Sequence, residues 1–350
     1  MARRSRQNPA VREYILRNVE KVPTSLTSST AAEFGLSRAA INRYVNRLID
    51  EGLIEATGNT RARRYSLRNI VSEYFTVDGI SKKWSSEDTV WRGQVRPLMK
   101  DLPQNIIDVC HYGFTEIFNN VIDHSASVAA DVLYEQTHNK VSIIVDDSGI
   151  GIFQKIQNDF DLPDARSALL ELSKGKLTSD KEHHAGQGIF FTSRMFNRFS
   201  ILSGNLFYIR LRTDDEGWLI ETGDRSDPIK GTRVRMEIET DADWTPREIF
   251  DRFQGSDISF LKTHVPVKLS QYPGEQLVSR SQAKRVLARF DQFTEVMLDF
   301  EGVNDIGQPF ADEIFRVFPL SHPDIVLQVM SANKNVSKMI AYTYAQAKDD

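Results

Sequence analysis

The stretch Val141-Ser-Ile-Ile-Val-Asp-Asp147-Ser-Gly149-Ile-Gly151 decides the fold of the central part of this chain. Its apolar half predicts a buried strand, because short apolar runs rich in β-branched residues are typical of strands. The strand ends in an acid, and the following glycines let the backbone turn tightly and approach a ligand closely. An aspartate at such a position can accept a hydrogen bond from an exocyclic amine. We therefore expect that a ligand can approach the end of this strand, and the motifs around it decide which ligand.

A helix upstream of this strand carries two polar residues on one face. Apolar residues recur at helical spacing between Gln104 and His124. Glu116 and Asn120 lie four residues apart, so they share one face of that helix, one turn from each other. A carboxylate and an amide in this arrangement can share a metal-bound water and a phosphate. Taken alone, such a pair is usually a solvated stripe on a helix.

Two glycine motifs follow downstream. Gly186-Gln-Gly188 precedes a helix that we expect over residues 189–199, whose free N–H groups suit phosphates. Gly231-Thr232 comes after a further polar stretch. Residues 154–185 are polar and contain Gly and Lys, and we expect a mobile lid there. The adjacent His183 and His184 suit phosphate contact or solvation better than metal binding, because no third ligand is suitably spaced.

In this order, the four motifs resemble those of the GHKL (Bergerat-fold) ATPases, over residues 85–240. The run that ends in Asn120-Val-Ile-Asp-His124 is most similar to the anti-sigma-factor kinase and histidine-kinase branches. The resemblance implies a Bergerat α/β sandwich that binds ATP and Mg²⁺. It implies that Glu116 is catalytic and polarises the attacking group, that Asn120 holds Mg²⁺, and that Asp147 binds the adenine amine. The other nucleotide contacts we expect are Gly149, Gly151, Gly186, Gly188, Thr232 and, from the lid, Lys176.

The first part of the chain, residues 8–68, has a different pattern. A helix is expected over residues 9–21, a second helix ends at Gly35, and Ser37 is a suitable N-cap for a third. Two short strands follow, around a turn at Gly58-Asn59. This order is similar to a winged helix-turn-helix, an α+β fold that inserts its second motif helix into the major groove of DNA.

Basic residues are concentrated in this segment. Residues 1–70 carry thirteen Lys and Arg against six Asp and Glu, and the remaining chain carries a net charge of −11. Arginine suits phosphate and guanine contacts, so we expect double-stranded DNA as a partner. Winged helices also serve as protein-docking modules, which is the alternative. The residues predicted to contact DNA are Arg38, Asn42, Arg43, Arg47, Arg61, Arg63 and Arg64.

The last part of the chain alternates strands and helices over residues 264–350, which predicts a small α/β layer. Val296-Met-Leu-Asp-Phe-Glu-Gly-Val303 resembles STAS-type domains, the partners of anti-sigma-factor kinases. Those domains accept phosphate on a serine at the start of the next helix. Residues 304–310 contain no Ser or Thr, which argues against phosphorylation at that place. A surface that docks an unknown protein partner is the better interpretation.

The sequence therefore predicts a multidomain protein: a winged helix-turn-helix over 1–70, a GHKL domain over 71–245 and a STAS-like domain over 262–350. We expect a DNA-binding regulator, a homodimer, in which Mg²⁺-ATP binding and slow hydrolysis switch dimerisation, DNA binding or partner binding. The alternatives are a partner-switching serine/threonine kinase and a nucleotide-gated scaffold with negligible turnover. With Cys110 as the single cysteine and no apolar run long enough to span a bilayer, a cytoplasmic location and no membrane partner are expected.

Overall fold

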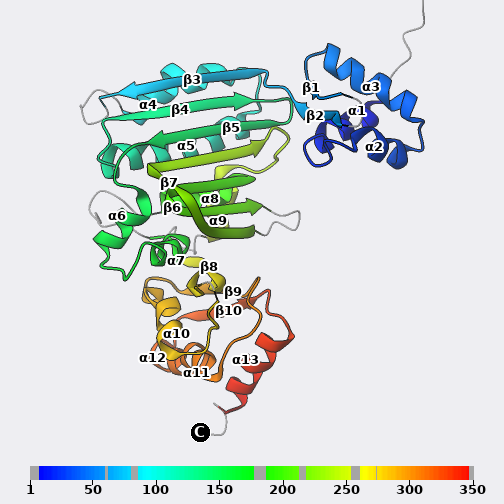
Figure 1. Ribbon diagram of the computed structural model, residues 1–350. Coiled ribbons are helices and arrows are strands. Elements are labelled where there is room, and N and C mark those ends of the chain that lie inside the picture. Colours follow the sequence, from blue (N-terminus) through cyan, green and yellow to red (C-terminus); the bar gives the residue numbers. More distant parts are fainter. Residues whose placement is uncertain are drawn as a thin grey trace, which may run out of the picture.

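The chain folds around two hydrophobic cores. The structure is a computed structural model that describes residues 8–59, 62–79, 86–176, 187–212, 218–253, 261–272 and 274–346. The smaller core belongs to the N-terminal segment alone, hereafter the head. The larger core runs from Val90 to Ile340 and is shared by the middle and C-terminal parts. The head lies beside one end of a large sheet, and the C-terminal part lies beyond the edge of that sheet formed by its last strands (Figure 1).

The head has the predicted winged helix-turn-helix arrangement. The turn between its second and third helices follows from two residues: Gly35 adopts φ +61°, and the Ser37 hydroxyl accepts a hydrogen bond from the Ala40 amide at 3.2 Å. Ile41, Val45 and Leu48 point from the third helix into the core. The elements are α1 (Pro9–Asn18), α2 (Leu26–Phe34), α3 (Arg38–Asp50), β1 (Ile54–Thr57) and β2 (Arg64–Leu67), the two strands being antiparallel.

The middle part is built on a five-stranded sheet in the order β3-β4-β5-β7-β6, antiparallel throughout. Burial alternates along the strands, so one face of the sheet belongs to the core. The central pair is in a register that sets Asp147 directly opposite Thr232. The strands are β3 (Val71–Asp78), β4 (Ala129–Gln136), β5 (Lys140–Asp147), β6 (Arg198–Arg212) and β7 (Trp218–Glu239).

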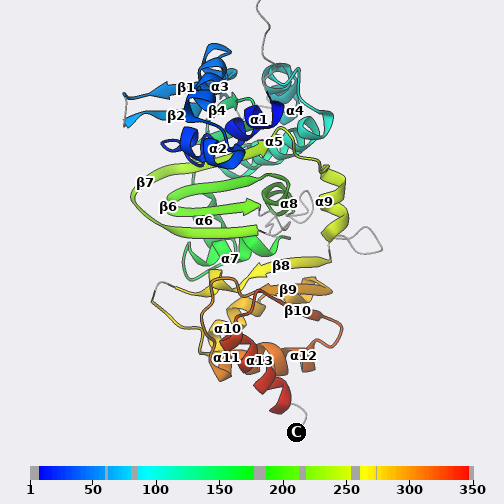
Figure 2. The same cartoon turned by 90° about the vertical axis from the view of Figure 1, so that its right-hand side faces the viewer.

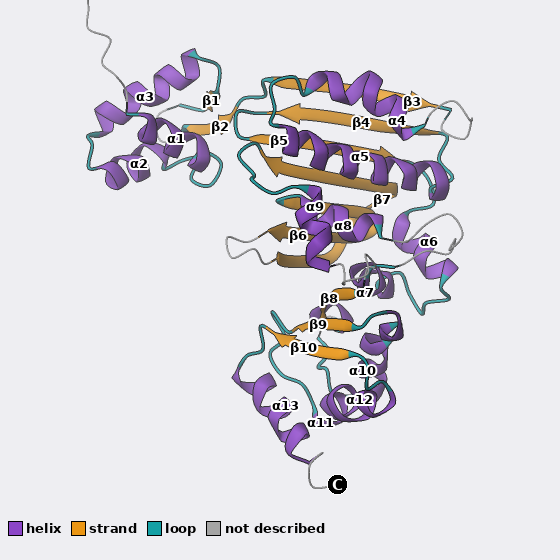
Figure 3. Ribbon diagram, turned by 180° about the vertical axis from the view of Figure 1, so that it is seen from behind, coloured by secondary structure: helices purple, strands orange, loops and turns teal. Residues whose placement is uncertain are grey.

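A layer of helices covers the buried face of the sheet (Figure 3). The predicted long helix is confirmed as α5 (Gln104–His124), and Phe114 and Phe118 pack from it into the core. The helices α8 (Gly188–Met195) and α9 (Pro246–Phe253) lie beside it, and α4 (Glu87–Val90) precedes a short π-helical turn and a 3₁₀ turn. The middle part is thus a two-layer α/β sandwich.

Two local features of the middle part differ from a simple reading of the sequence. The first part of the expected lid includes two helices, α6 (Ile152–Asp159) and α7 (Ser167–Lys174), because Phe153, Ile156 and Leu169 bury an apolar stripe that the polar composition concealed. Residues 177–185 of the expected lid lie outside the described residues. The helix expected over residues 189–199 ends at Met195. Alternating burial at Phe199 and Ile201 instead makes the following residues part of β6.

The C-terminal part has the predicted alternation of strands and helices. Its three-stranded parallel sheet has the order β10-β9-β8. Figure 2 shows this sheet below the larger one, with helices on its far side. The elements are β8 (Lys262–Pro266), α10 (Arg280–Leu287), β9 (Glu295–Asp299), α11 (Gln308–Asp312), α12 (Phe318–Ser321), β10 (Val326–Met330) and α13 (Lys334–Gln346), with a 3₁₀ turn after β8, another before β9 and a π-helical turn after α11.

Candidate functional site

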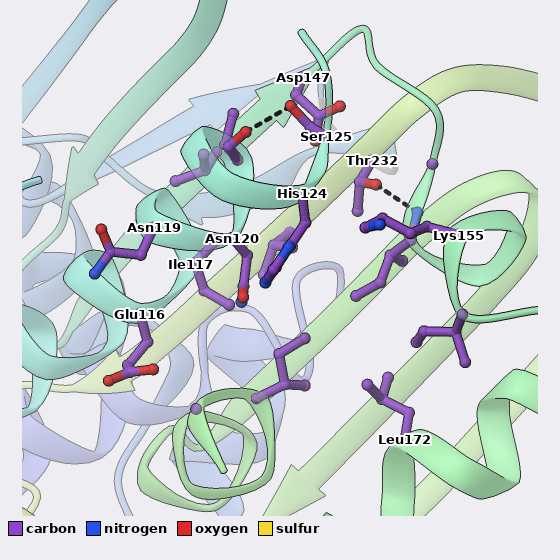
Figure 4. Close-up of a pocket in the computed structure, with 18 of the residues that line it drawn as sticks. Glu116, Ile117, Asn119, Asn120, His124, Ser125, Asp147, Lys155, Leu172 and Thr232 are labelled. Atoms are coloured by element: carbon purple, nitrogen blue, oxygen red, sulfur yellow. Dashed lines mark hydrogen bonds between the residues drawn. The ribbon is translucent and has the colours of Figure 1, made fainter. Parts of the chain in front are cut away.

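A cavity of about 390 Å³ lies between α5, the end of β5, the part of β7 around Thr232, and the helices α6, α7 and α8 (Figure 4). Residues from segments far apart in the sequence meet in its wall. Six of the residues predicted to form a site line it: Glu116, Asn120, Asp147, Gly151, Gly188 and Thr232. The fold therefore brings together motifs that are more than a hundred residues apart in the chain.

One face of α5 forms a side of the cavity. Glu116 and Asn120 are one helical turn apart, and His124 lies a further turn along the same face. In Figure 4 the Glu116 carboxylate lies at the α8 side of the cavity, and His124 lies nearer the end of β5. The sequence analysis did not assign His124 to the site, although its four-residue spacing from Asn120 was the available signal.

Asp147 lies at the end of β5 and is almost fully buried. One carboxylate oxygen accepts a hydrogen bond from the Gly149 amide at 2.8 Å. Burial raises the pKa of Asp147, and backbone hydrogen bonds from Gly149 and Thr232 oppose that shift only in part. Within the described residues no Lys or Arg forms an ion pair with Asp147. Such a carboxylate is suited to a neutral N–H donor, because it is desolvated and its partners are main-chain amides.

Two glycines allow close approaches that a side chain would prevent. At Gly188, the first residue of α8, a Cβ would lie 2.0 Å from a carboxylate oxygen of Glu116. Gly151 has φ +91°, and a Cβ there would lie 2.7 Å from the Ser203 hydroxyl. Gly149 lies in the turn behind the cavity and is not part of its wall.

Thr232 connects the sheet to the turn after β5. Its hydroxyl accepts a hydrogen bond from the Ile152 amide at 3.0 Å, which fixes the start of α6. This bond is drawn in Figure 4. Lys155, one turn further along α6, also lines the cavity and pairs with Asp159 at 3.0 Å. Sequence reasoning missed Lys155, because residues 154–185 were expected to form a mobile lid and no helix was predicted there.

One predicted contact does not reach the cavity. The amine of Lys176 donates a hydrogen bond to the Gln292 carbonyl at 2.6 Å and lies over the Phe293 ring, both in the C-terminal part of the chain. The expected role of Lys176 as a nucleotide contact is therefore corrected: tertiary packing directs its side chain toward the other domain. Gly186, His183 and His184 lie outside the described residues.

The head presents a second candidate site on the outer side of α3. Arg38, Asn42, Arg43 and Arg47 are all exposed. The Arg47 guanidinium pairs with Glu51, the residue that follows the helix, at 3.5 Å. Asn46, which the sequence analysis did not single out, is exposed between these residues and could have been found from helical spacing.

The β1–β2 hairpin, which is the wing of this domain, contributes fewer described residues to this surface. Arg64 is exposed in β2, and the Arg63 guanidinium lies 5.3 Å from the centre of the Tyr65 ring. Arg61 lies outside the described residues. The basic surface defined by these positions is therefore α3 with one strand of the hairpin.

Comparisons with known families support the domains predicted at the two ends of the chain. A model for winged helix-turn-helix DNA-binding domains matches residues 15–55, and a model for a STAS-like domain of unknown function matches residues 282–337. A search of curated proteins found no match to this chain. The chain thus combines a winged helix-turn-helix with a STAS-like domain, and the former indicates a DNA-binding regulator. None of the described helices is both long and apolar enough to cross a membrane.

Proposed function

We propose that the cavity binds ATP with Mg²⁺ and that the protein is a DNA-binding regulator controlled by that nucleotide. The observation that carries the proposal is the meeting of Glu116, Asn120, Asp147, Gly188 and Thr232 in one cavity. The two-layer sandwich agrees with the Bergerat architecture that the sequence motifs imply, with a long helix packed on an antiparallel sheet and the cavity between the layers.

The proposed roles follow the chemistry of each side chain. Asp147 accepts a hydrogen bond from the adenine amine, and Thr232 holds the turn that flanks the base. Glu116 polarises the group that attacks the γ-phosphate. Gly188, the first residue of α8, lies against Glu116 in the cavity wall, and the first N–H groups of that helix are donors suited to phosphate oxygens.

The residues present fit Mg²⁺ bound together with a nucleotide. The described residues include no cluster of three or more His, Cys, Asp or Glu side chains suited to hold a metal by themselves. Mg²⁺ usually keeps several waters and takes one or two protein oxygens plus substrate phosphates. The Asn120 amide oxygen, one turn from Glu116, would supply such a ligand, and the ion would neutralise phosphate charge.

Nucleotide titration of three variants tests this proposal. We expect Asp147→Asn to weaken binding of a fluorescent ATP analogue by about a hundredfold, because it loses a desolvated charged acceptor. Asp146→Asn is the matched control. Asp146 is the neighbouring acid on β5, it does not line the cavity, and it pairs with Arg233. Equal affinities for the two variants would exclude Asp147 from the site.

The third variant, Glu116→Ala, separates binding from turnover. It removes the group that polarises the nucleophile and leaves the base contacts intact, so binding should persist while phosphate release falls by a factor of about 10² to 10⁴. Labelled γ-phosphate distinguishes hydrolysis, which yields free phosphate, from transfer to a protein, which would support the kinase alternative. Unchanged turnover in Glu116→Ala would contradict the assigned role.

DNA binding is tested on the exposed face of α3. Arg43→Ala should weaken binding of the full chain to duplex DNA about tenfold or more and reduce the dependence on salt, because one phosphate or guanine contact is lost. Arg92→Ala is the control, since Arg92 is an exposed arginine outside the head. Equal losses in the two variants would show that only overall charge matters.

A further inference from the structure

Two helices of the cavity wall also contact the STAS-like domain. Leu172 of α7 and Phe190 of α8 line the cavity, and each lies within one turn of a basic residue on the same helix, Lys174 and Arg194 respectively. Both basic side chains are fully buried. Burying a cation costs free energy unless it is hydrogen-bonded and paired. The folded state therefore depends on the groups that contact these two side chains.

Lys174 joins α7 to the end of α10. Its amine pairs with Glu171 at 2.7 Å and donates hydrogen bonds to the carbonyls of Arg285, at 3.2 Å, and Ala288, at 2.9 Å. These carbonyls belong to the last turn of α10 and the residue that follows it, where carbonyl groups lack partners within the helix. Lys174 therefore caps a helix of the STAS-like domain from the wall of the cavity.

Glu171 completes this connection. Its second carboxylate oxygen pairs with Arg289 at 3.0 Å, and the other end of that guanidinium donates to the Gly175 carbonyl, also at 3.0 Å. The Lys176 amine bonds to the Gln292 carbonyl nearby. The end of α7 is thus held by residues 285–292 of the C-terminal part.

Arg194 joins α8 to the parallel sheet of the C-terminal part. Its guanidinium lies 3.3 Å from the centre of the Phe190 ring and 3.5 Å from the His264 carbonyl on β8. The His264 side chain bonds to Asp299 at the end of β9, at 2.9 Å. A continuous series of buried contacts therefore runs from the cavity wall to the loop after β9.

We propose that the STAS-like domain sets the nucleotide affinity of the cavity through two contacts. One is the contact of Lys174 in α7 with the end of α10, and the other is the contact of Arg194 in α8 with β8. A displacement of α10 or β8 must move the ends of α7 and α8 or break buried hydrogen bonds. The inference rests on the proposed nucleotide binding. Because coupling between sites is reciprocal, nucleotide also stabilises the contacts of α10 and β8 by the same free energy.

Hydrogen exchange of the full chain, with and without an ATP analogue, is the first test. We expect nucleotide to slow exchange in α7 and α8 and also at the end of α10 and in β8 and β9, while the exposed face of the head stays unchanged. Protection confined to the cavity elements would overturn the proposal. Failure of the analogue to bind the wild-type chain would instead overturn the proposed nucleotide function, and the inference with it.

The second test replaces the capping lysine. Lys174→Met preserves volume, removes the donors to α10 and leaves Glu171 paired with Arg289. We expect the affinity for the analogue to fall about five- to twentyfold, within the usual range of coupling between sites, with protection retained in α8 and lost from α10. Lys284→Met, on the exposed side of α10, is the control and should bind as the wild type does. Wild-type affinity in Lys174→Met together with unchanged protection of α10 would contradict the proposal.

Discussion

The middle part of the chain contacts the head and the STAS-like domain in two different ways. Toward the head, the described ion pairs lie at the surface: Arg17 pairs with Asp241, both exposed, and the partly exposed Lys140 pairs with the exposed Glu20. Toward the STAS-like domain, buried charges and one continuous apolar core cross the boundary. Exposed pairs are screened by salt and weak, whereas buried ones are costly to break.

The difference indicates which parts move together. The head has its own core, formed by α1, α2, α3 and the β1–β2 hairpin, so it can change its position without exposing apolar surface of the sheet. The STAS-like domain cannot leave the middle part without exposing residues of the shared core. We therefore expect the middle and C-terminal parts to unfold as one cooperative unit and the head as another.

Removing the shared carboxylate should give the largest effect. Glu171→Gln leaves Lys174 and Arg289 without their common counter-charge in a buried site, which typically costs about 3–5 kcal/mol. Urea unfolding should show this loss in the transition of the larger unit, with the transition of the head unchanged. A loss below about 1 kcal/mol would mean that the contact is as weak as the one with the head.

Acid should weaken the same boundary through His264. Burial lowers the pKa of His264 to about 4, against a hydrogen bond to Asp299 that raises it. Below about pH 6.5 the unfolded chain therefore binds a proton at His264 that the folded chain does not bind. The contribution of His264 to the free energy of unfolding is fully present above that pH and is lost as the pH decreases toward 4. The expected loss is about 3 kcal/mol across this window.

The pH dependence is checked by chemical unfolding of wild type and His264→Gln between pH 4.5 and 7.5. Glutamine keeps an amide N–H donor for Asp299 but cannot take up a proton in this range, so the part of the slope that depends on His264 should disappear. His322→Gln, in the same domain, should keep the wild-type slope. An equal slope in wild type and His264→Gln would contradict the assignment.

The contact with the head should show the smallest effect. Arg17 and Asp241 are both more than half exposed, so a double-mutant cycle of Arg17→Gln and Asp241→Asn should give a coupling below about 1 kcal/mol. That coupling should vanish at high salt. A salt-independent coupling of several kcal/mol would show that the head is attached as firmly as the STAS-like domain.

Local pattern was sufficient to predict much of the fold and part of the site. The apolar spacing of α5 gave its bounds as Gln104–His124, and the Gly35 and Ser37 signals located the helix-turn-helix. Helical spacing also predicted that Glu116 and Asn120 share a face. These features depend on neighbours within a few residues, so the sequence contains the information for them.

Other features depend on residues that are distant in the chain. The sequence did not reveal that Lys155 faces the cavity, since this requires α6 to be held by Thr232 eighty residues away. It also placed Lys176 beside a nucleotide, whereas the packing of α7 against residues 285–292 directs that side chain to the other domain. A polar, glycine-containing stretch looks the same in sequence whether or not distant apolar residues bury part of it.

The sequence by itself determined the order of the parts, the winged head and the identity of the motif residues, because periodicity, capping and glycine placement act locally. Only the tertiary structure decided that Asp147 stands opposite Thr232, and that Glu116 meets Gly188. It also decided that Lys174 and Arg194 connect the cavity wall to the STAS-like domain. Strand register and the burial of charge are set by contacts between segments that no local pattern records.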